Sequence, residues 1–311
     1  MHHCSPQLHD IDYIDEIQIN RDTMKKLTKL LARGALTVSL FVAISVSAAT
    51  FTFTAIPDAD ESQLRTRFEK VALYLSEQLG VEVKYVPVKS YSAAVTAFRN
   101  NQVQLAWFGG LSGVQARRLV PGSQAIAQGY EDQFFKSYFI AHHSTGIEMS
   151  DRFPDITDKT FTFGSKGSTS GRLMPQYYIE QHLNEKPQQA FERVGFSGDH
   201  NRTIVQVQSG TYEVGAVNYK VWESALAAGS IDTNKVKVIW KSPTYPDYQW
   251  TIRADVETDF GLGFVDKVQT ALLNMDSPAL LKSFPRSSFV KAENKDFQPV
   301  EDVAKQIGLI D

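Results

Sequence analysis

The chain has 311 residues, of which 42% are hydrophobic and 22% are charged, an ordinary composition for one large or two medium globular domains. Its formal net charge of -3 excludes a global electrostatic attraction to nucleic acid or to an anionic membrane surface. Any anion-binding function would therefore depend on local geometry.

The first 49 residues predict a targeting segment. A basic stretch runs from Met24 to Arg33, residues 35–46 are apolar, and residues 47–49 offer the small side chains of a cleavage site. The apolar run is too short to form a stable membrane span. We therefore expect a cleaved signal peptide at residues 24–49 and a periplasmic mature chain. An uncleaved membrane anchor is the alternative.

Residues 1–23 do not fit a signal peptide, because they are polar and acidic and precede the basic region. We interpret them as an N-terminal extension from a mis-assigned start, with Met24 as the true start; an expression scar is the alternative. The one cysteine of the chain, Cys4, lies in this segment. The mature chain is therefore expected to have no disulfide, no thiolate metal site and no cysteine to carry a lipid.

From residue 51 the pattern of apolar residues predicts alternating strands and helices. Strands are expected at residues 51–56, 81–86, 103–108, 125–128 and 135–141, and helices at residues 60–80, 90–100 and 111–119, with Ser90 as an N-cap. This rhythm predicts an α/β fold with a mostly parallel sheet and helices on both faces.

A connector rich in proline and aspartate follows at residues 151–159, and the rhythm then restarts. Strands are expected at 160–164, near 194, and at 214–218, 236–240 and 249–252, with helices at 168–183, 201–209, 219–228, 259–274 and 300–307. The restart predicts two lobes, residues 50–145 with 246–311 and residues 146–245. We expect a ligand in the cleft between them, at the carboxyl ends of the strands.

The run Gly167-Ser168-Thr169-Ser170-Gly171 lies at a predicted strand-to-helix turn. Glycines let the backbone approach a ligand, hydroxyls donate hydrogen bonds, and a helix N-terminus carries partial positive charge. The run therefore predicts a neutral cradle for an anion, and a glycine-rich turn capped by Ser168 is the alternative. It is not a Walker loop, because Lys166 precedes Gly167, and not a nucleophile elbow, because Thr169 stands at the centre.

Other polar or glycine-bearing turns are expected at the same edge of the sheets, and each has a structural alternative. His200 is as well suited to a structural role, Asp199 to a helix cap and Trp107 to the core. Tyr245, Tyr248 and Trp250 would form either a hinge cluster or a cleft wall. The remaining candidate ligand-binding residues are Tyr91, Asn201, Phe108, Gly109, Gly110, Pro57, Asp58, Asn218 and Tyr219.

The sequence offers no candidate residues for metal binding, cofactor binding or catalysis. His142 and His143 are adjacent, so in a strand they would point to opposite faces, and His182 and His200 are not at metal-binding spacing. We find no activated nucleophile and no paired carboxylates. We therefore expect no catalytic residue, no metal and no cofactor.

The order of these motifs resembles the periplasmic substrate-binding proteins of phosphate, phosphite and phosphonate ABC transporters over about residues 51–290. The resemblance rests on residues 88–91, 103–109, 164–171 and 198–201. Residues 107–116 and 129–134 look like a subgroup named for selenate binding. The resemblance implies a two-lobed type II periplasmic binding protein fold, in which Ser168, Thr169, Ser170, Tyr91 and His200 hold the oxyanion.

Two departures from the family pattern bear on the ligand. Asn201 stands where phosphonate binders commonly have an acidic residue, and Phe108 where they often have tyrosine. The loss of the acidic residue argues against an aminoalkylphosphonate and leaves phosphite, phosphate-like, selenate and selenite ligands open. A site without a carboxylate would favour a fully deprotonated anion such as selenate, unless Asp58 or Asp199 points into the cleft.

Three functions follow from this interpretation. The first is a monomeric receptor that delivers a small oxyanion to an inner-membrane ABC permease. The second is a sensor subunit that reports the same anion to a membrane histidine kinase. The third is an enzyme on the same fold, such as a relative of thiamine-precursor synthases, against which the lack of catalytic residues argues.

Overall fold

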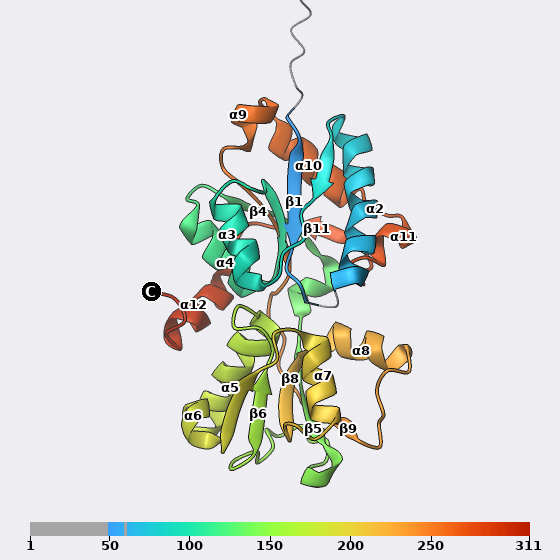
Figure 1. Cartoon of the computed structure of the whole chain (residues 1–311). Coiled ribbons are helices and arrows are strands. Elements are labelled where there is room, and N and C mark those ends of the chain that lie inside the picture. Colours follow the sequence, from blue (N-terminus) through green and yellow to red (C-terminus); the bar gives the residue numbers. More distant parts are fainter. Residues whose placement is uncertain (1–48, 59–60) are drawn as a thin grey trace, which may run out of the picture. The chain divides into compact units, whose positions relative to one another are not determined.

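Two separate sheets organise the described part of the chain, residues 49–58 and 61–311, in the computed structural model (Figure 1). The predicted extension and nearly all of the predicted signal peptide lie outside the described residues. Residues 48–311 form one compact unit. Among the described residues, no helix is long and apolar enough to cross a membrane.

The first lobe contains a six-stranded sheet in the order β11-β4-β10-β3-β1-β2. Its strands are β1 (Phe51–Ala55), β2 (Val83–Tyr85), β3 (Leu105–Phe108), β4 (Gln124–Gly129), β10 (Gln249–Ile252) and β11 (Phe289–Lys291). Its helices are α2 (Glu61–Leu79), α3 (Tyr91–Arg99), α4 (Gly110–Leu119), α9 (Val256–Phe260), α10 (Phe264–Leu273), α11 (Pro278–Leu281) and α12 (Gln298–Gln306).

The second lobe contains a five-stranded sheet in the order β7-β6-β8-β5-β9. Its strands are β5 (Ser137–His142), β6 (Thr160–Phe163), β7 (Arg193–Phe196), β8 (Val214–Asn218) and β9 (Val236–Lys241). Its helices are η3 (Thr169–Leu173), α5 (Met174–Leu183), α6 (Pro187–Ala190), α7 (His200–Gln208) and α8 (Tyr219–Ala227). Short 3₁₀ turns are η1 (Tyr130–Phe134), η2 (His143–Thr145) and η4 (Asn294–Phe297).

The chain passes between the lobes twice, at residues 130–136 and 242–248, which we call the two crossings. The lobe boundary expected between residues 245 and 246 falls within the second crossing. The first lies earlier than the predicted boundary at residue 145, because β5 pairs with β8 and β9 in the second sheet. The two crossings are joined by reciprocal backbone hydrogen bonds between Phe135 and Tyr245 and by a bond from Asp247 N–H to Asp132 O of 2.9 Å.

The sheets are mixed, and the prediction of mostly parallel sheets is wrong. Five of the nine strand pairings are antiparallel, and all five involve β5, β10 or β11. β5 and β10 each begin just after a crossing, without a crossover helix. They therefore run away from the junction of the lobes, whereas the parallel strands run toward it. The crossings consequently lie near the carboxyl ends of four strands, β1, β3, β6 and β8.

The predicted helix at residues 168–183 begins with a turn of π-helix. Ser168 is its N-cap, and the Ser168 hydroxyl accepts a hydrogen bond from Gly171 N–H at 2.9 Å. Leu173 N–H donates to Ser168 O at 3.0 Å, one residue wider than an α-helical bond. Such wide turns occur often at functional sites. The cap predicted for Ser168 is therefore present, but it accounts for only one of the three hydroxyls in the run.

Candidate functional site

The two lobes and a crossing meet at Thr169. The Thr169 Oγ1 atom of the second lobe accepts a buried hydrogen bond of 3.0 Å from Leu111 N–H in the first turn of α4. Gly110 N–H donates to Asp247 Oδ1 of the crossing at 2.8 Å. A Cβ built on Gly109 would stand 3.2 Å from Asp247 Oδ1 and 3.4 Å from Thr169 Oγ1, so glycine allows this close approach.

Three buried polar atoms around this junction have no hydrogen bond of good geometry among the described residues: Tyr91 Oη, His200 Nε2 and Asp247 Oδ2. The Ser168 hydroxyl is nevertheless near enough to Tyr91 to oppose the rise of its pKa on burial. Tyr91 lies against the run, since a Cβ on Gly167 would stand 3.1 Å from Tyr91 Cβ. His200 lies against its other end, since a Cβ on Gly171 would stand 2.9 Å from His200 Cε1. Buried polar groups normally have partners. All three residues lie beside the serine–threonine run or its neighbour Gly109.

His200 is positioned to donate a hydrogen bond. Burial lowers the pKa of its imidazole to about 3, so the ring is neutral at physiological pH. Its Nδ1 atom accepts a bond of 3.2 Å from Asn218 N–H, which places the single ring proton on Nε2. The unpartnered Nε2–H is therefore a donor, suited to an anion oxygen.

Asp247 supplies an acceptor to the same place. Burial raises the pKa of this carboxyl to about 7, against the lowering effects of the Gly110 N–H and the Thr169 hydroxyl. The group is thus close to half-protonated near neutral pH. The expected site without a carboxylate is not what the structure contains, because Asp247 brings one to Thr169 from the crossing.

A fixed positive charge follows the run directly. Arg172 is buried, with its guanidinium carbon 4.6 Å from the centre of the Phe163 ring and 5.3 Å from that of Phe196. Burial lowers the pKa of Arg172 to about 10, which leaves it protonated at neutral pH. Its Nη1 atom has no hydrogen-bond partner among the described residues. This charge favours an anion at the start of the helix.

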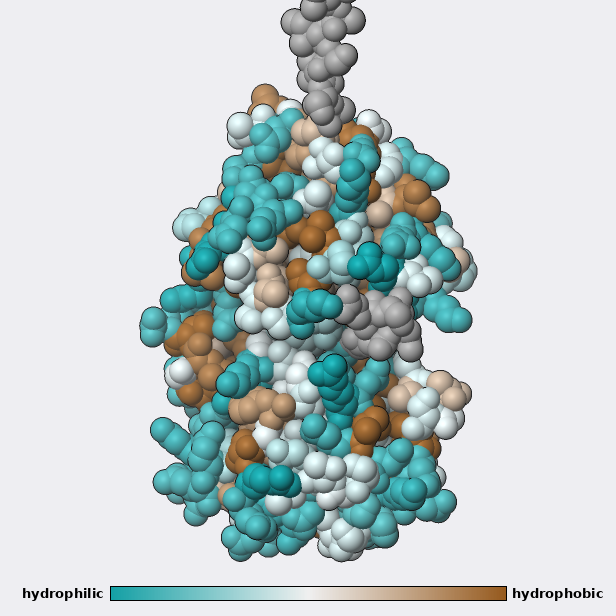
Figure 2. Space-filling view, in the orientation of Figure 1, coloured by the Kyte–Doolittle hydropathy of each residue, from teal (hydrophilic) through white to brown (hydrophobic). Residues whose placement is uncertain are grey.

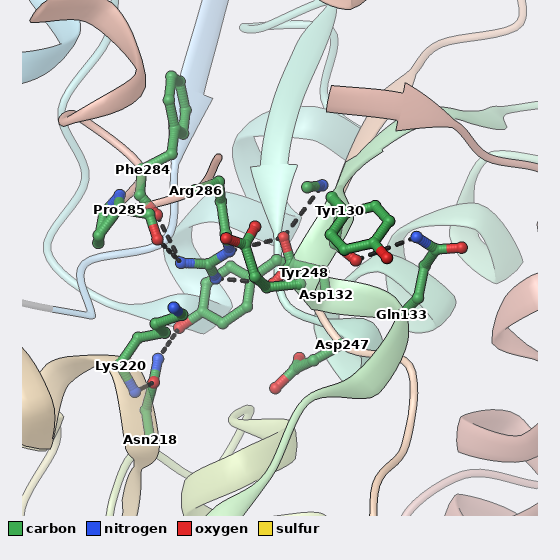
Figure 3. Close-up of polar contacts among 12 residues, drawn as sticks. Tyr130, Asp132, Gln133, Asn218, Lys220, Asp247, Tyr248, Phe284, Pro285 and Arg286 are labelled. Carbon is green, nitrogen blue, oxygen red and sulfur yellow. Dashed lines mark hydrogen bonds and ion pairs between the residues drawn. The ribbon is translucent and has the colours of Figure 1, made fainter. Parts of the chain in front are cut away.

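A chain of hydrogen bonds through Tyr248 joins the lobes beside this site, and we call it the latch. Tyr248 Oη donates to Asp58 Oδ2 of the first lobe at 2.8 Å and accepts from Asn218 Nδ2 of the second lobe at 3.0 Å. Figure 3 shows Asn218 reaching Tyr248 from the neighbouring lobe. Asn218 also caps α8 through Oδ1, which fixes the orientation of its amide.

A buried ion pair fixes the first crossing to the first lobe. Arg286 donates to both carboxylate oxygens of Asp132, with distances of 2.8 and 2.7 Å, and the same carboxylate accepts from Gly129 N–H at 3.0 Å. Figure 3 shows Arg286 beside Asp132 and Tyr248. The guanidinium carbon lies 5.1 Å from the centre of the Tyr248 ring and 5.3 Å from that of Phe135. The carboxylate of Asp132 holds the pKa of Arg286 above its usual range despite burial. The pair therefore positions the crossing that also carries the latch.

Most of the predicted site residues come together at the junction of the lobes. Ser170 is buried in the run, and its carbonyl accepts a bond of 2.7 Å from the Ser137 hydroxyl. The residues at the junction are Tyr91, Gly109, Gly110, Ser168, Thr169, Ser170 and His200, and Asp58 and Asn218 are in the latch.

Four predicted site residues lie elsewhere. Phe108 is fully buried edge-on against Phe98, so it is part of the core of the first lobe. Tyr219 packs edge-on against Phe135 at 4.8 Å, and Pro57 is half-buried beside Asp58. Asn201 does not contact the serine–threonine run in a printed hydrogen bond, but it lines a cavity together with the latch residues Asp58 and Asn218. Asp199 caps α7, as its structural alternative predicts. Trp107 is buried among aromatic rings but also lines the cavity with Asp58 and Asn218, so it has features of both the core and the cleft wall.

Comparison with known proteins identifies the family. The model of the family described as "ABC transporter, phosphonate, periplasmic substrate-binding protein" matches residues 53–297. A relative from Prochlorococcus marinus (strain MIT 9301), named "Probable ABC transporter phosphite binding protein PhnD1", is 40% identical over 264 residues, which cover 82% of this chain and 89% of the relative.

Solved structures agree with this result. The structure of PhnD1 from the same organism in complex with methylphosphonate has a TM-score of 0.80 and 39% identity, and the match covers 84% of this chain and 99% of that one. A binding protein component of an ABC phosphonate transporter from Pseudomonas aeruginosa, at 22% identity, has the same fold with a TM-score of 0.71 over 82% of this chain and 85% of that one. The predicted type II periplasmic binding protein fold is confirmed. These relatives are substrate-binding proteins of ABC transporters and not enzymes, in agreement with the prediction. This chain belongs to the phosphonate-binding family of periplasmic substrate-binding proteins of ABC transporters.

Proposed function

We propose that this chain is the receptor that delivers phosphite or a small phosphonate to an inner-membrane ABC permease, and that the anion binds where Thr169 meets Asp247. The observation that carries the proposal is the set of buried, unpartnered polar atoms of Tyr91, His200 and Asp247 around the run. The close relative named for phosphite binding and the structure with methylphosphonate support this ligand class.

The balance of donors and acceptors favours a ligand that carries a proton. Tyr91, His200 and the hydroxyls of the run are suited to donate to anion oxygens, whereas the carboxyl of Asp247 in its ionised form can only accept. A monoprotonated phosphite or phosphonate offers one P–OH to Asp247 and two further oxygens to the donors. Selenate and sulfate have no proton at neutral pH, so Asp247 must itself be protonated to meet one of their oxygens, and their binding should weaken as the pH rises through about 7.

The donor and acceptor balance and the names of the relatives both disfavour the alternatives from the sequence, which are selenate binding, a sensor subunit and an enzyme. The resemblance to a selenate-binding subgroup finds no support in the matched family or in the Prochlorococcus marinus relative and its structure, which are named for phosphonate, phosphite and methylphosphonate. The same names refer to transport, so a permease is the expected partner and a sensor kinase is not. An enzyme on this fold is not expected, because the matched family consists of substrate-binding proteins.

Titration calorimetry with a panel of anions tests the proposal. The wild-type protein should bind phosphite and methylphosphonate with Kd values in the micromolar range or below, and sulfate and selenate at least about tenfold more weakly, a difference of about 1.4 kcal/mol. Phosphate is included to measure the selectivity among phosphorus oxyanions. No heat with either phosphite or methylphosphonate, or tighter binding of selenate, would overturn the proposal.

The pKa of Asp247 predicts a pH-dependent difference in stability between the wild type and Asp247→Asn. Burial raises this pKa from 3.8 to about 7, so between these values the folded state holds a proton that the unfolded chain has released. The associated stability is complete below about pH 4 and is lost as the pH rises through about 7. Asparagine releases no proton, and its Oδ1 atom can still accept from Gly110 N–H.

The free energy of unfolding should therefore shift in favour of Asp247→Asn by up to about 1.4 kcal/mol per pH unit as the pH rises from about 5 to about 7. Urea unfolding of the ligand-free proteins at several pH values measures this difference. The titration of His200, which acts in the opposite direction, is common to both proteins and cancels. A difference that stays constant over the range would contradict a raised pKa at this position.

A further inference from the structure

A pair of buried hydroxyls connects the second crossing to the serine–threonine run, and we call this connection the relay. The Ser137 hydroxyl, at the start of β5, donates to the Ser170 carbonyl at 2.7 Å and lies 2.6 Å from the Tyr245 hydroxyl. A carbonyl can only accept, so the single hydroxyl proton of Ser137 goes to Ser170, and Tyr245 donates to Ser137. The relay therefore has one direction, from Tyr245 through Ser137 to the run.

The helix that follows the run cannot pair the Ser170 carbonyl itself. In the π-helical turn each N–H donates to the carbonyl five residues back, as Met174 N–H does to Thr169 O. The N–H that would reach Ser170 O in this series belongs to residue 175, which is proline and has no N–H. A buried carbonyl without a partner is unfavourable, and the Ser137 hydroxyl supplies the missing donor.

The next carbonyl of the turn is also paired from outside the helix. Gly164 N–H, which follows β6, donates to Gly171 O at 2.8 Å. The carbonyls of Ser170 and Gly171 are thus held by the start of β5 and the end of β6. Because these two peptides follow Thr169 directly, their orientation determines where the Thr169 side chain lies.

The relay is shielded from solvent. Ser137, Ser170 and Tyr245 are 0%, 1% and 5% exposed, in contrast with the outer face in Figure 2, which is mostly hydrophilic with small scattered apolar patches. Burial raises the pKa of Tyr245 well above its usual range, so the phenol stays protonated and remains a donor. Since water has little access, a hydrogen bond lost from the relay leaves a buried carbonyl unpaired.

The second crossing acts on the run at two points. Tyr245 reaches it through the relay, and Asp247 lies two residues further along the crossing. Asp247 Oδ1 and Thr169 Oγ1 both lie within 3.4 Å of the position that a Cβ on Gly109 would take. A shift of the run would therefore change the position of the Thr169 hydroxyl relative to the Asp247 carboxyl.

We infer that Ser137 and Tyr245 are positioning residues for anion binding, which act through the Ser170 carbonyl and do not contact the ligand. The inference rests on the proposed function, since it takes the run as the anion site. The relay holds the run in its wide turn, with the donors of the run and the carboxyl of Asp247 arranged around one anion. It thereby determines the affinity for a phosphorus oxyanion from outside the site.

Titration calorimetry with phosphite and methylphosphonate on variants that lack single hydroxyls tests this role. Ser137→Ala removes the central hydroxyl of the relay, whereas Tyr245→Phe removes only the first donor and keeps the bond to Ser170. The matched control is Thr162→Val, which removes a fully buried hydroxyl of the same sheet whose two hydrogen bonds do not reach the run. Urea unfolding of each ligand-free protein establishes that it is folded.

The affinity of Ser137→Ala for both anions should fall by about 10- to 30-fold, and that of Tyr245→Phe by about three- to tenfold. Adding Tyr245→Phe to Ser137→Ala should change the affinity by less than about twofold more, because the relay is already broken. Thr162→Val should lower the stability but keep the affinity within about twofold of the wild type, as expected of a hydroxyl with only a structural role.

Wild-type affinity in Ser137→Ala, an equal loss in Thr162→Val, or losses that multiply in the double variant would each overturn the inference. If Ser137→Ala does not fold, Tyr245→Phe decides the question, and wild-type affinity in that variant overturns the inference. If the wild type binds neither phosphite nor methylphosphonate, the proposed function fails, and the inference fails with it.

Discussion

Replacing Thr169 by valine should weaken the binding of phosphite and methylphosphonate by about 10- to 150-fold. The change removes one hydroxyl without changing the shape of the side chain, and a hydrogen bond to a charged group contributes about 1.5–3 kcal/mol. The hydroxyl also accepts from Leu111 N–H across the junction, so its loss disfavours the closed arrangement of the lobes as well. Titration calorimetry gives the affinity.

Two further variants separate this effect from the helix cap. Thr169→Ser keeps the hydroxyl and should stay within about threefold of the wild-type affinity. Ser165→Ala changes a half-buried serine of the same loop that lies outside the junction. Its affinity should also stay within about threefold of the wild type. Wild-type affinity in Thr169→Val would mean that the run serves only as the start of the helix.

Breaking the buried ion pair should produce the largest loss of stability. Arg286→Met leaves the carboxylate of Asp132 buried without its guanidinium partner, and the loss of one partner of such a pair costs about 3–5 kcal/mol. Because Asp132 lies in the first crossing and the guanidinium packs on Tyr248, the alignment of the latch should suffer with it. Urea unfolding of the ligand-free protein measures the free energy.

The exposed pair of Lys295 and Glu293 provides the control. Its side chains are 78% and 50% exposed, so Lys295→Met should change the free energy of unfolding by less than about 1 kcal/mol. The double variant Asp132→Asn with Arg286→Met, which leaves no unpaired charge, should recover part of the loss. Equal stability of Arg286→Met and the wild type would show that the pair does not hold the crossing.

The sequence predicted the individual elements well because strands and helices follow the local period of apolar residues. The strand expected at residues 214–218 and the helix expected at residues 90–100 match β8 and α3 closely, including the Ser90 cap. Strand direction has no such local signal. Whether β5 runs parallel or antiparallel to its neighbours depends on where the chain crosses between the lobes. The early first crossing places β5 in the second sheet, antiparallel to β8 and β9.

The site was predictable where its residues follow strands or begin helices. Tyr91, His200 and the run at Ser168 and Thr169 could be found because each starts a helix after a strand. Phe108 was placed in the site by its neighbours, although the side chains of a strand alternate and its ring packs on Phe98 in the core.

Asp247 and the latch tyrosine could not be assigned from the sequence. They lie in a crossing without periodic pattern, and the sequence identified only a hinge or a cleft wall there. The partner of Asp247, Gly110, is 137 residues away along the chain, and Arg286 is 154 residues from Asp132. Contacts of such separation depend on the fold of both lobes, so the carboxylate that changes the expected ligand became visible only in three dimensions.

A crystal structure of the protein grown with methylphosphonate would test the central claim most directly. The account predicts the phosphonate oxygens within hydrogen-bonding distance of the Thr169 hydroxyl, the Tyr91 hydroxyl and His200 Nε2, with one oxygen facing the carboxyl of Asp247. A phosphonate bound elsewhere, away from Thr169 and Asp247, would contradict it.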